Sequence, residues 1–203
     1  MDFYQAIAAR RTVRHFSSSP VETEKINRVL TAGLSAPSNA HLKSWQFILL
    51  KDRGNRRAAL ADAMKARDLK NQDEIEKIVD GKSEELKEVY RRALPFQLTM
   101  MLTAPEVLLA CYRMKALGEI KTHFELNPLA SVWLCIENIL LAMSAEGLYG
   151  CTYTPFETRE LKAFLGLPPG YEVGAVIPFG YPAVVPEPNK PEPLPPRLHI
   201  DRW

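Results

Sequence analysis

The sequence has few of the short patterns that mark common enzyme and nucleotide-binding classes. No G-x-G-x-x-G and no G-x-x-x-x-G-K-[ST] occurs, so neither a Rossmann dinucleotide site nor a P-loop is indicated. H-E-x-x-H and G-x-S-x-G are absent as well, and the four histidines stand at no spacing typical of metal ligands. We therefore predict no metal site and find no support for a serine hydrolase mechanism.

Cysteine is scarce in this chain. Cys111, Cys135 and Cys151 are widely spaced, and no C-x-x-C occurs. An odd number of cysteines argues against a disulfide framework. We interpret the three residues as reduced and mostly buried thiols, as is usual in a cytoplasmic protein.

The chain also lacks an excess of charge of one sign, because 26 basic residues face 24 acidic ones. A strongly basic surface for nucleic acid or for an anionic membrane is therefore not expected. The N-terminus carries an acid at Asp2 and no apolar signal-peptide core. The most apolar segment, residues 129–145, contains Glu137 and Asn138, so we expect a buried helix there rather than a membrane span.

The residues that are present have the composition of an ordinary globular protein, with 46% apolar and 25% charged residues. A chain of 203 residues fits one domain over residues 1–203. Capping residues and apolar periodicity predict helices at residues 2–10, 22–35, 53–67, 127–147 and 157–166. Apolar runs predict strands at residues 45–51, 104–113 and 172–181. This interleaving indicates an α/β or α+β fold with a small central sheet.

The expected long helix over residues 127–147 has clear signals at both ends. Asn127 is expected to be its N-cap, Pro128 its first helical residue and Gly147 its stop.

Two further segments differ from the rest in composition. Residues 70–92 are charged at helical spacing with an expected break at Gly81, which predicts a solvated helical excursion or a lid. We call residues 70–103 the charged excursion. The tail from Pro182 is dense in proline, so we expect it to run extended and without helix.

A basic cluster follows the first expected helix, where "ARRTVRHF" places Arg10, Arg11, Arg14 and His15 around Thr12. Such a cluster is either a solvated patch or an anion site, because guanidinium forks suit phosphate oxygens. In an extended stretch Arg10, Thr12 and Arg14 point the same way, toward one ligand. The residues alone leave both interpretations open.

A second unusual stretch is "APSNAHLKSWQF", residues 36–47. Its small-residue turn leads through His41 and Lys43 to Trp45 and an expected strand. We assign Trp45 to the core, as is usual for an aromatic residue at the start of a strand. Lys43 is either solvated or close to a bound anion.

These two stretches, in this order, resemble the opening of the nitroreductase family of flavoproteins. "ENILLAMSAEGLYGCTYTPF" is similar to the long core helix and following turn of that family, and "PFGYPAVVPEP" with "PPRLHI" is similar to its closing strand and late basic residue. The charged stretch at residues 70–92 has no clear counterpart. The resemblance implies an α+β fold with a small, mostly antiparallel sheet flanked by helices, a long core helix and an extended C-terminal tail. It also implies a homodimer with one FMN in each of two sites between the subunits.

The resemblance assigns the basic cluster to the cofactor. It implies that Arg10 and Thr12 hold the FMN phosphate and that Arg11 flanks it. Arg14 is placed near the N1–C2 edge of the flavin, where reduction puts negative charge that a cation stabilises.

Further cofactor contacts follow from the same resemblance. Pro37, Ser38 and Asn39 are expected to reach the ribityl and phosphate side from the partner subunit. Backbone donors are expected against flavin N5 and O4 from a run of four residues, Thr152, Tyr153, Thr154 and Pro155.

The late part of the chain and two substituted positions complete the expected cofactor site. Arg197 is expected to close over the phosphate from the tail, with Lys190 as a second cation. His41 replaces the usual asparagine of the family and Lys43 the usual glutamine, so His41 either binds the cofactor or meets substrate.

The activity implied by the resemblance is a ping-pong transfer of hydride from NAD(P)H through FMN to an electron-poor acceptor such as a nitroaromatic or a quinone. The cofactor carries the difficult chemistry and the protein supplies orientation and field. Phe124, Tyr153 and Phe156 either line the acceptor pocket or are ordinary packing residues. Two alternatives stay open: another flavin reaction, such as reductive dehalogenation or substrate oxidation, and a non-catalytic FMN-binding dimer.

Overall fold

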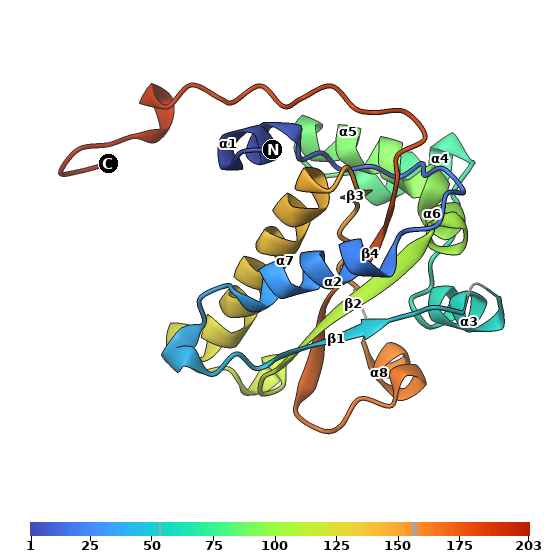
Figure 1. Ribbon diagram of the computed structural model, residues 1–203, viewed down its shortest axis with the longest axis horizontal. Helices are drawn as coiled ribbons and strands as arrows, with labels where there is room; N and C mark the ends of the chain where they lie inside the picture. The colour runs from blue at the N-terminus through green and yellow to red at the C-terminus, as the bar shows by residue number, and fades with distance from the viewer. Residues whose placement is uncertain (53, 156–157) are drawn as a thin grey trace.

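A four-stranded antiparallel sheet forms the centre of the molecule (Figure 1). The computed structural model describes residues 1–52, 54–155 and 158–203. The strands are β1 (Trp45–Leu49), β2 (Glu106–Arg113), β3 (Tyr149–Gly150) and β4 (Tyr171–Gly180), in the order β1-β2-β4-β3. The antiparallel pairing with interleaved helices confirms the α+β fold and the small central sheet.

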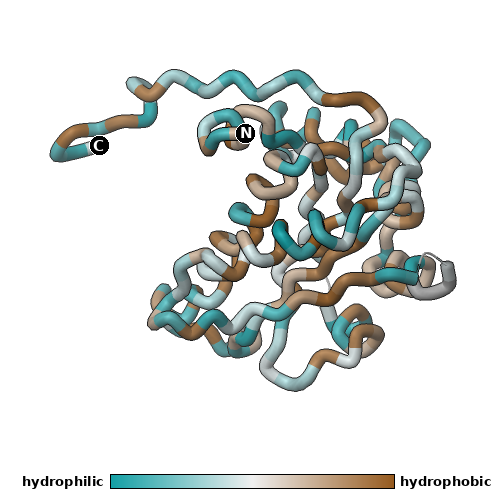
Figure 2. The backbone as a smooth tube through the Cα atoms, viewed as in Figure 1, coloured by the Kyte–Doolittle hydropathy of each residue, from teal (hydrophilic) through white to brown (hydrophobic). Residues whose placement is uncertain are grey.

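Strand β2 has both of its faces buried, which explains its continuous apolar sequence. Leu108, Ala110 and Tyr112 belong to one core cluster, whereas Val107 and Leu109 belong to another. Because successive side chains of a strand point to opposite faces, β2 separates two hydrophobic layers. Figure 2 shows hydrophobic residues running along the central strands.

Helices cover the two faces of the sheet. The described helices are α1 (Phe3–Ala9), α2 (Thr23–Leu34), α3 (Asn55–Ala63), α4 (Gln72–Val79), α5 (Glu84–Ala93), α6 (Gln97–Thr103), α7 (Asn127–Ala145) and α8 (Arg159–Leu165). On one face α7 packs against α1, α2 and β2, and on the other α3 packs against α6 and α8 (Figure 1). The predicted helix over residues 53–67 ends earlier than expected, because the chain turns at Lys65, whose φ is +54°.

The long helix α7 is the core helix that the sequence predicted. The stretch His123–Ala145 is long and apolar enough to cross a membrane by length and composition. Val132, Ile136 and Ile139 are nevertheless fully buried between α2 and the sheet, as in a core helix. Gly33 allows this close packing, because a Cβ at that position would lie 2.6 Å from Cγ1 of Ile139.

The predicted start of α7 is wrong in its details. A short 3-10 helix, η4 (His123–Leu126), runs directly into α7, so Asn127 is a helical residue and its side chain does not cap the helix. The capping signal lies further upstream, where Thr122 and Glu125 form a capping box. The predicted end is confirmed, since the chain leaves the helix at Gly147 with φ +74°.

The charged excursion contains α4, α5, the 3-10 turn η2 (Leu94–Phe96) and α6. Its predicted break is confirmed at Gly81, where φ is +72°. Helices α4 and α5 enclose a small core of their own, made of Leu69, Ile75, Val79 and Leu94. Arg91 joins the two helices through a two-pronged contact with Glu76, at 2.8 Å for each oxygen.

The segment that follows α1 and the start of the C-terminal tail run extended beside each other. Phe16 bridges Pro182, and the amide of Asn189 donates to the carbonyl of Ala8 at 2.7 Å. The tail therefore passes along α1 before it leaves the body (Figure 1). The expectation of a helix-free tail is wrong at one 3-10 turn, η5 (Pro195–Arg197), where proline suits the first position of a helical turn.

Candidate functional site

The basic cluster lies directly beside β3 and the residues that follow it. Thr12 forms a parallel bridge with Gly150, and the amide of Val13 donates to the Gly150 carbonyl at 3.2 Å. This pairing holds residues 10–14 extended, so the alternation proposed for Arg10, Thr12 and Arg14 has a structural basis. A small cleft of about 40 Å³ opens between the two segments, lined by Arg10, Arg11, Thr12, Leu140, Ser144, Tyr149, Gly150 and Thr152.

A larger cavity of about 400 Å³ begins at Arg14, and we call it the inner cavity. Its described lining residues are Arg14, Leu86, Val89, Tyr90, Ala93, Gln97, Met100, Cys151, Thr152, Tyr153, Thr154 and Pro155. Among them Arg14 is the only charged residue. The structure thus brings together, within one chain, the basic cluster and the run of residues 152–155 that the sequence assigned to the same site.

The guanidinium of Arg14 is also close to the thiol of Cys151. Burial raises the pKa of Cys151, and the charge and hydrogen bonding of Arg14 act in the opposite direction. All three cysteines are buried and free, as the sequence predicted. A single cation in an otherwise uncharged wall makes this end of the cavity suitable for an anionic edge of a ligand.

Two arginines of the basic cluster already have protein partners. Arg10 Nε lies 3.1 Å from Oε1 of Glu137 on α7, and both side chains are 39–47% exposed. Arg11 Nη1 donates to the carbonyl of Glu187 in the tail at 2.9 Å. The sequence did not predict that Glu137 pairs with Arg10. A signal was available, because a carboxylate within the most apolar segment of a chain usually has a specific partner.

The backbone of residues 152–155 corrects one expectation. Tyr153 uses both its amide and its carbonyl to pair with Val176, each at 2.8 Å, and Pro155 has no amide hydrogen. These two residues therefore cannot act as backbone donors to a flavin. Thr152 and Thr154 alternate with them and direct their amides to the opposite side of the segment.

The turn that contains Pro37, Ser38 and Asn39 lies near the other end of α7. The amide of Asn39 donates to Oγ of Ser131 at 3.0 Å. Ser131 and the cleft-lining Ser144 are 13 positions apart on one helix, a separation of about 20 Å. One chain therefore does not bring this turn to the basic cluster, and its assignment stays a prediction that requires a second chain.

The residues after this turn have an unusual backbone. Ala40, His41 and Lys43 have φ values of +49°, +56° and +44°, in the left-handed region that non-glycine residues seldom adopt. His41 and Lys43 are exposed, whereas Trp45 is buried as predicted. Residues held in this region are strained, and such strain is often found at binding sites.

The remaining candidates are not joined to the inner cavity within one chain. Phe124 lies in η4 and is 68% exposed. Lys190 lies exposed on the tail, and Arg197 pairs with Glu192 there. Phe156 lies outside the described residues. The roles of these residues in cofactor or acceptor binding stay predictions.

The sequence predicted the charged excursion as a possible lid but did not identify which of its residues line the inner cavity. Leu86, Val89, Tyr90 and Ala93 form one stripe of α5 and face the inner cavity. Leu86 and Val89 are 43% and 51% exposed. The signal was available, because this stripe repeats every three to four positions on an otherwise charged helix.

The antiparallel sheet, the long core helix and the extended tail define a nitroreductase-like fold. The model of the nitroreductase family matches residues 7–181. The chain belongs to the nitroreductase family.

Curated relatives include iodotyrosine deiodinases. The protein from Hydra vulgaris is 27% identical over 90% of this chain and 65% of its own length. Iodotyrosine deiodinase 1 from Sus scrofa is 30% identical over 94% of this chain and 66% of its own length. The chain thus spans about two thirds of the length of these relatives.

Solved structures confirm the fold. Oxidized iodotyrosine deiodinase bound to FMN and 3-iodo-L-tyrosine aligns with a TM-score of 0.73 at 23% identity, over 100% of this chain and 98% of that one. The NADPH:FMN oxidoreductase from Vibrio harveyi, complexed with NAD⁺, aligns with a TM-score of 0.71 at 21% identity, over 99% of this chain and 77% of that one.

Proposed function

We propose that this chain is an FMN-dependent oxidoreductase that passes a hydride from NAD(P)H to a small electron-poor acceptor. The observation that carries the proposal is the direct pairing of the extended basic cluster with Gly150, just before residues 151–155, which places Arg14 beside those residues in the wall of the inner cavity. Membership of the nitroreductase family and the likeness to FMN-binding structures support it.

The donor set fits a ligand with a phosphate at one end and an anionic ring edge near the other. Arg10, Arg11 and Thr12 line the small cleft and offer two guanidinium forks and a hydroxyl to a phosphate. The ion pair of Arg10 with Glu137 is exposed, so it contributes no more than about 1 kcal/mol and can be exchanged for a phosphate.

The remaining residues orient the ring and exclude water. Arg14 would stabilise negative charge on a flavin edge at this end of the inner cavity, and the amides of Thr152 and Thr154 would be available to donate to the ring. The apolar stripe of α5 covers the opposite side of the inner cavity. When bound, FMN supplies the group that accepts and returns the hydride.

A second chain completes the proposed site. The turn at residues 37–39 can approach the cofactor only from a partner subunit, because its own chain holds it at the far end of α7. We therefore propose a homodimer with FMN at the subunit interface. We also propose a cytoplasmic location, in line with the three free thiols.

Reductive dehalogenation of an aromatic substrate is the second candidate function. It is favoured by one observation, the similarity to iodotyrosine deiodinases at 25–30% identity over 90% or more of this chain. The same residues would serve this reaction, since it requires the same cofactor and the same inner cavity.

One experiment separates these functions. The purified protein is reconstituted with FMN, and its visible absorbance is followed under anaerobic conditions after addition of NADH, NADPH or dithionite. Bleaching by either nicotinamide, followed by recovery with a nitroaromatic or a quinone, is the expected result. Bleaching by dithionite alone, with recovery by an iodophenol and release of iodide, would favour the second candidate. A protein that retains no flavin after reconstitution would contradict both.

A further inference from the structure

A second cavity adjoins the inner cavity, and we call it the outer cavity. It has a volume of about 390 Å³ and is lined by Ala63, Met64, Lys65, Arg67, Leu69, Ile78, Lys82, Tyr90, Leu94, Gln97 and Tyr153. Tyr90, Gln97 and Tyr153 line both cavities, so the two share a wall made of polar side chains. A ligand that occupies both cavities must therefore pass these three side chains.

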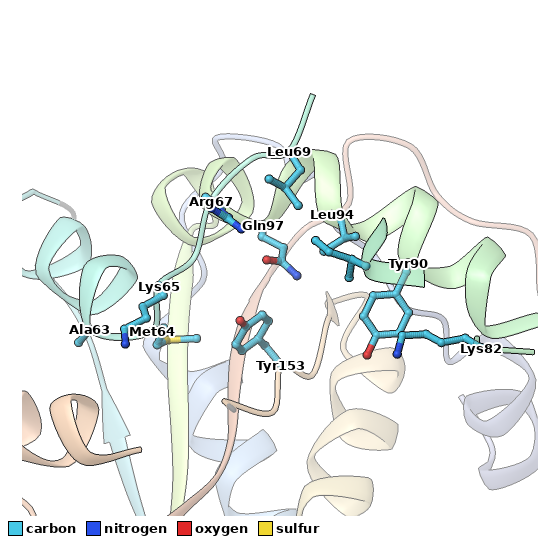
Figure 3. A pocket seen from close by; sticks show the side chains of 11 residues that line it. Ala63, Met64, Lys65, Arg67, Leu69, Lys82, Tyr90, Leu94, Gln97 and Tyr153 are labelled. Carbon is cyan, nitrogen blue, oxygen red and sulfur yellow. The ribbon is translucent and has the colours of Figure 1, made fainter. Parts of the chain in front are cut away.

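The outer cavity carries positive charge from two separate segments, the α3–α4 connection with Lys65 and Arg67 and the α4–α5 connection with Lys82. Figure 3 shows Lys65 and Arg67 on one side of it, Lys82 beside Tyr90 on the other, and Tyr153 between them. None of its described lining residues is acidic. The cavity therefore has a net positive wall.

Neighbouring carboxylates neutralise this charge only weakly. Lys65 Nζ lies 3.8 Å from Oε1 of Glu160, and both side chains are more than half exposed. Asp68 follows Arg67 in sequence, but it accepts hydrogen bonds from the amide and hydroxyl of Thr99 instead. Within the described residues Arg67 forms no ion pair. Lys82 lies over the ring of Tyr90, 5.5 Å from its centroid, and likewise has no carboxylate partner in the part of the chain that the structure describes.

The backbone at Lys65 is a second, independent observation. Lys65 follows α3 with φ +54°, a position that helices commonly give to glycine. A lysine here adopts a backbone conformation that glycine would adopt at lower cost. The conformation places its side chain at the outer cavity (Figure 3).

We propose that Lys65, Arg67 and Lys82 bind an anionic substituent of the acceptor, such as a carboxylate, while its aromatic ring lies in the inner cavity. The inference depends on the proposed function, since it names the class of acceptor for the same site. A free ammonium group would meet no carboxylate among the described lining residues. We therefore expect aromatic monoanions to bind better than neutral analogues and better than zwitterionic amino acids.

The test uses the FMN-reconstituted protein and matched ligands. Binding to the oxidised protein is measured by the perturbation of flavin absorbance, with 4-nitrobenzoate against 4-nitrobenzamide, and with 3-(4-hydroxy-3-iodophenyl)propanoate against 3-iodo-L-tyrosine. The first member of each pair is expected to bind about tenfold more tightly, on the scale of two or three exposed charge contacts. Added salt is expected to reduce this preference.

Variants assign the preference to the three cations. The combined change Lys65→Gln, Arg67→Gln and Lys82→Gln is expected to weaken binding of 4-nitrobenzoate about tenfold and to leave 4-nitrobenzamide unchanged. Lys77→Gln is the matched control, because Lys77 is exposed on α4 in the same excursion and does not line the cavity. Retained flavin in both variants shows that the fold is intact.

The outcomes separate this inference from the proposed function. Equal affinities of the wild-type protein for the benzoate and the benzamide, or an undiminished preference in the triple variant, would overturn the inference. If the wild-type protein bound NADPH or NADH more tightly than the triple variant, and both bound the acceptors equally well, the three cations would belong to the site of the nicotinamide donor. That result would also overturn the inference. A clear preference for the anion in a protein that turns over no acceptor would support the inference and contradict the proposed function.

Discussion

At the scale of single residues, Arg10 and Glu137 make opposite contributions to the proposed phosphate site. Arg10→Ala is expected to weaken FMN binding by about 1.5–3 kcal/mol, the scale of a charge-assisted hydrogen bond. Glu137→Gln is expected to strengthen binding by up to about 1 kcal/mol, because it releases Arg10 from an exposed ion pair. Quenching of FMN fluorescence measures both dissociation constants.

Another arginine supplies the control for this pair. Arg28 forms an ion pair with Glu146, at 2.7 Å, and neither residue lines the cleft. Arg28→Ala should leave FMN binding unchanged. Equal FMN affinity of wild type and Arg10→Ala would remove Arg10 from the phosphate site.

Arg14 is expected to act on the redox potential rather than on retention alone. A cation at the ring edge favours the reduced, more negative cofactor. Arg14→Gln should therefore lower the midpoint potential of bound FMN by about 30–60 mV, the equivalent of one charged hydrogen bond in a two-electron couple. Equilibration with a reference dye measures the potential. An unchanged potential in a variant that still binds FMN would exclude this role.

At the scale of elements, the contact between α2 and α7 depends on the small size of Gly33. Gly33→Ala is expected to destabilise the protein by about 1–3 kcal/mol in urea unfolding, because the new Cβ would meet Ile139 at 2.6 Å in a closely packed interface. Adding Ile139→Val should recover part of that loss. Gly118→Ala is the control, since a Cβ there meets nothing within 4 Å. Equal loss in both alanine variants would contradict the packing argument.

The start of α7 gives a prediction about acid stability. Glu125 accepts from Lys115 Nζ at 2.6 Å and from the amide of Lys121 at 2.8 Å, and these contacts lower its pKa to about 2. A carboxyl whose pKa is lowered in the folded state contributes stability that is present above its ordinary pKa of 4.5 and is lost as the pH falls toward 2. Glu125→Gln should flatten the pH dependence of unfolding in that interval. If the variant kept the wild-type slope of stability against pH in that interval, the slope would be due to other carboxyl groups.

Helices and strands were predictable from the sequence where one physical signal dominated. The apolar run of β2 and the periodicity of α2 placed both elements within two residues of their observed bounds. Asn127 was misassigned, because a capping residue and a proline at the start of a helix look the same whether or not a 3-10 turn precedes them. The cationic outer cavity had no local signal, because Lys65, Arg67 and Lys82 are brought together only by the packing of α3 and the charged excursion.

At the scale of the whole molecule, the exposed apolar face of α1 supports the proposed dimer. Phe3, Tyr4 and Ile7 are 64%, 81% and 43% exposed on one short helix. Adjacent exposed apolar side chains of this size usually mark an interaction surface. We expect sedimentation to give about twice the mass of the 22.9 kDa chain, with one FMN per chain.

Charges on α1 are expected to separate the subunits and to release the cofactor. Phe3→Asp with Ile7→Asp should give a monomer that retains little FMN, since the partner's contribution to the site is lost. Asn27→Asp with Thr31→Asp adds the same charge to exposed positions of α2 and should remain dimeric and yellow. A monomer that keeps FMN would show that one chain suffices for the cofactor.

The small separate core of α4 and α5 has a consequence for how the family diversifies. Leu69, Ile75, Val79 and Leu94 pack among themselves, so the residues around them can change while the central sheet and the basic cluster remain as they are. In the proposed enzyme, substitutions around this small core would therefore alter the choice of acceptor and leave the flavin contacts in place. Grafting the helical pair onto a related scaffold would then be expected to transfer acceptor selectivity.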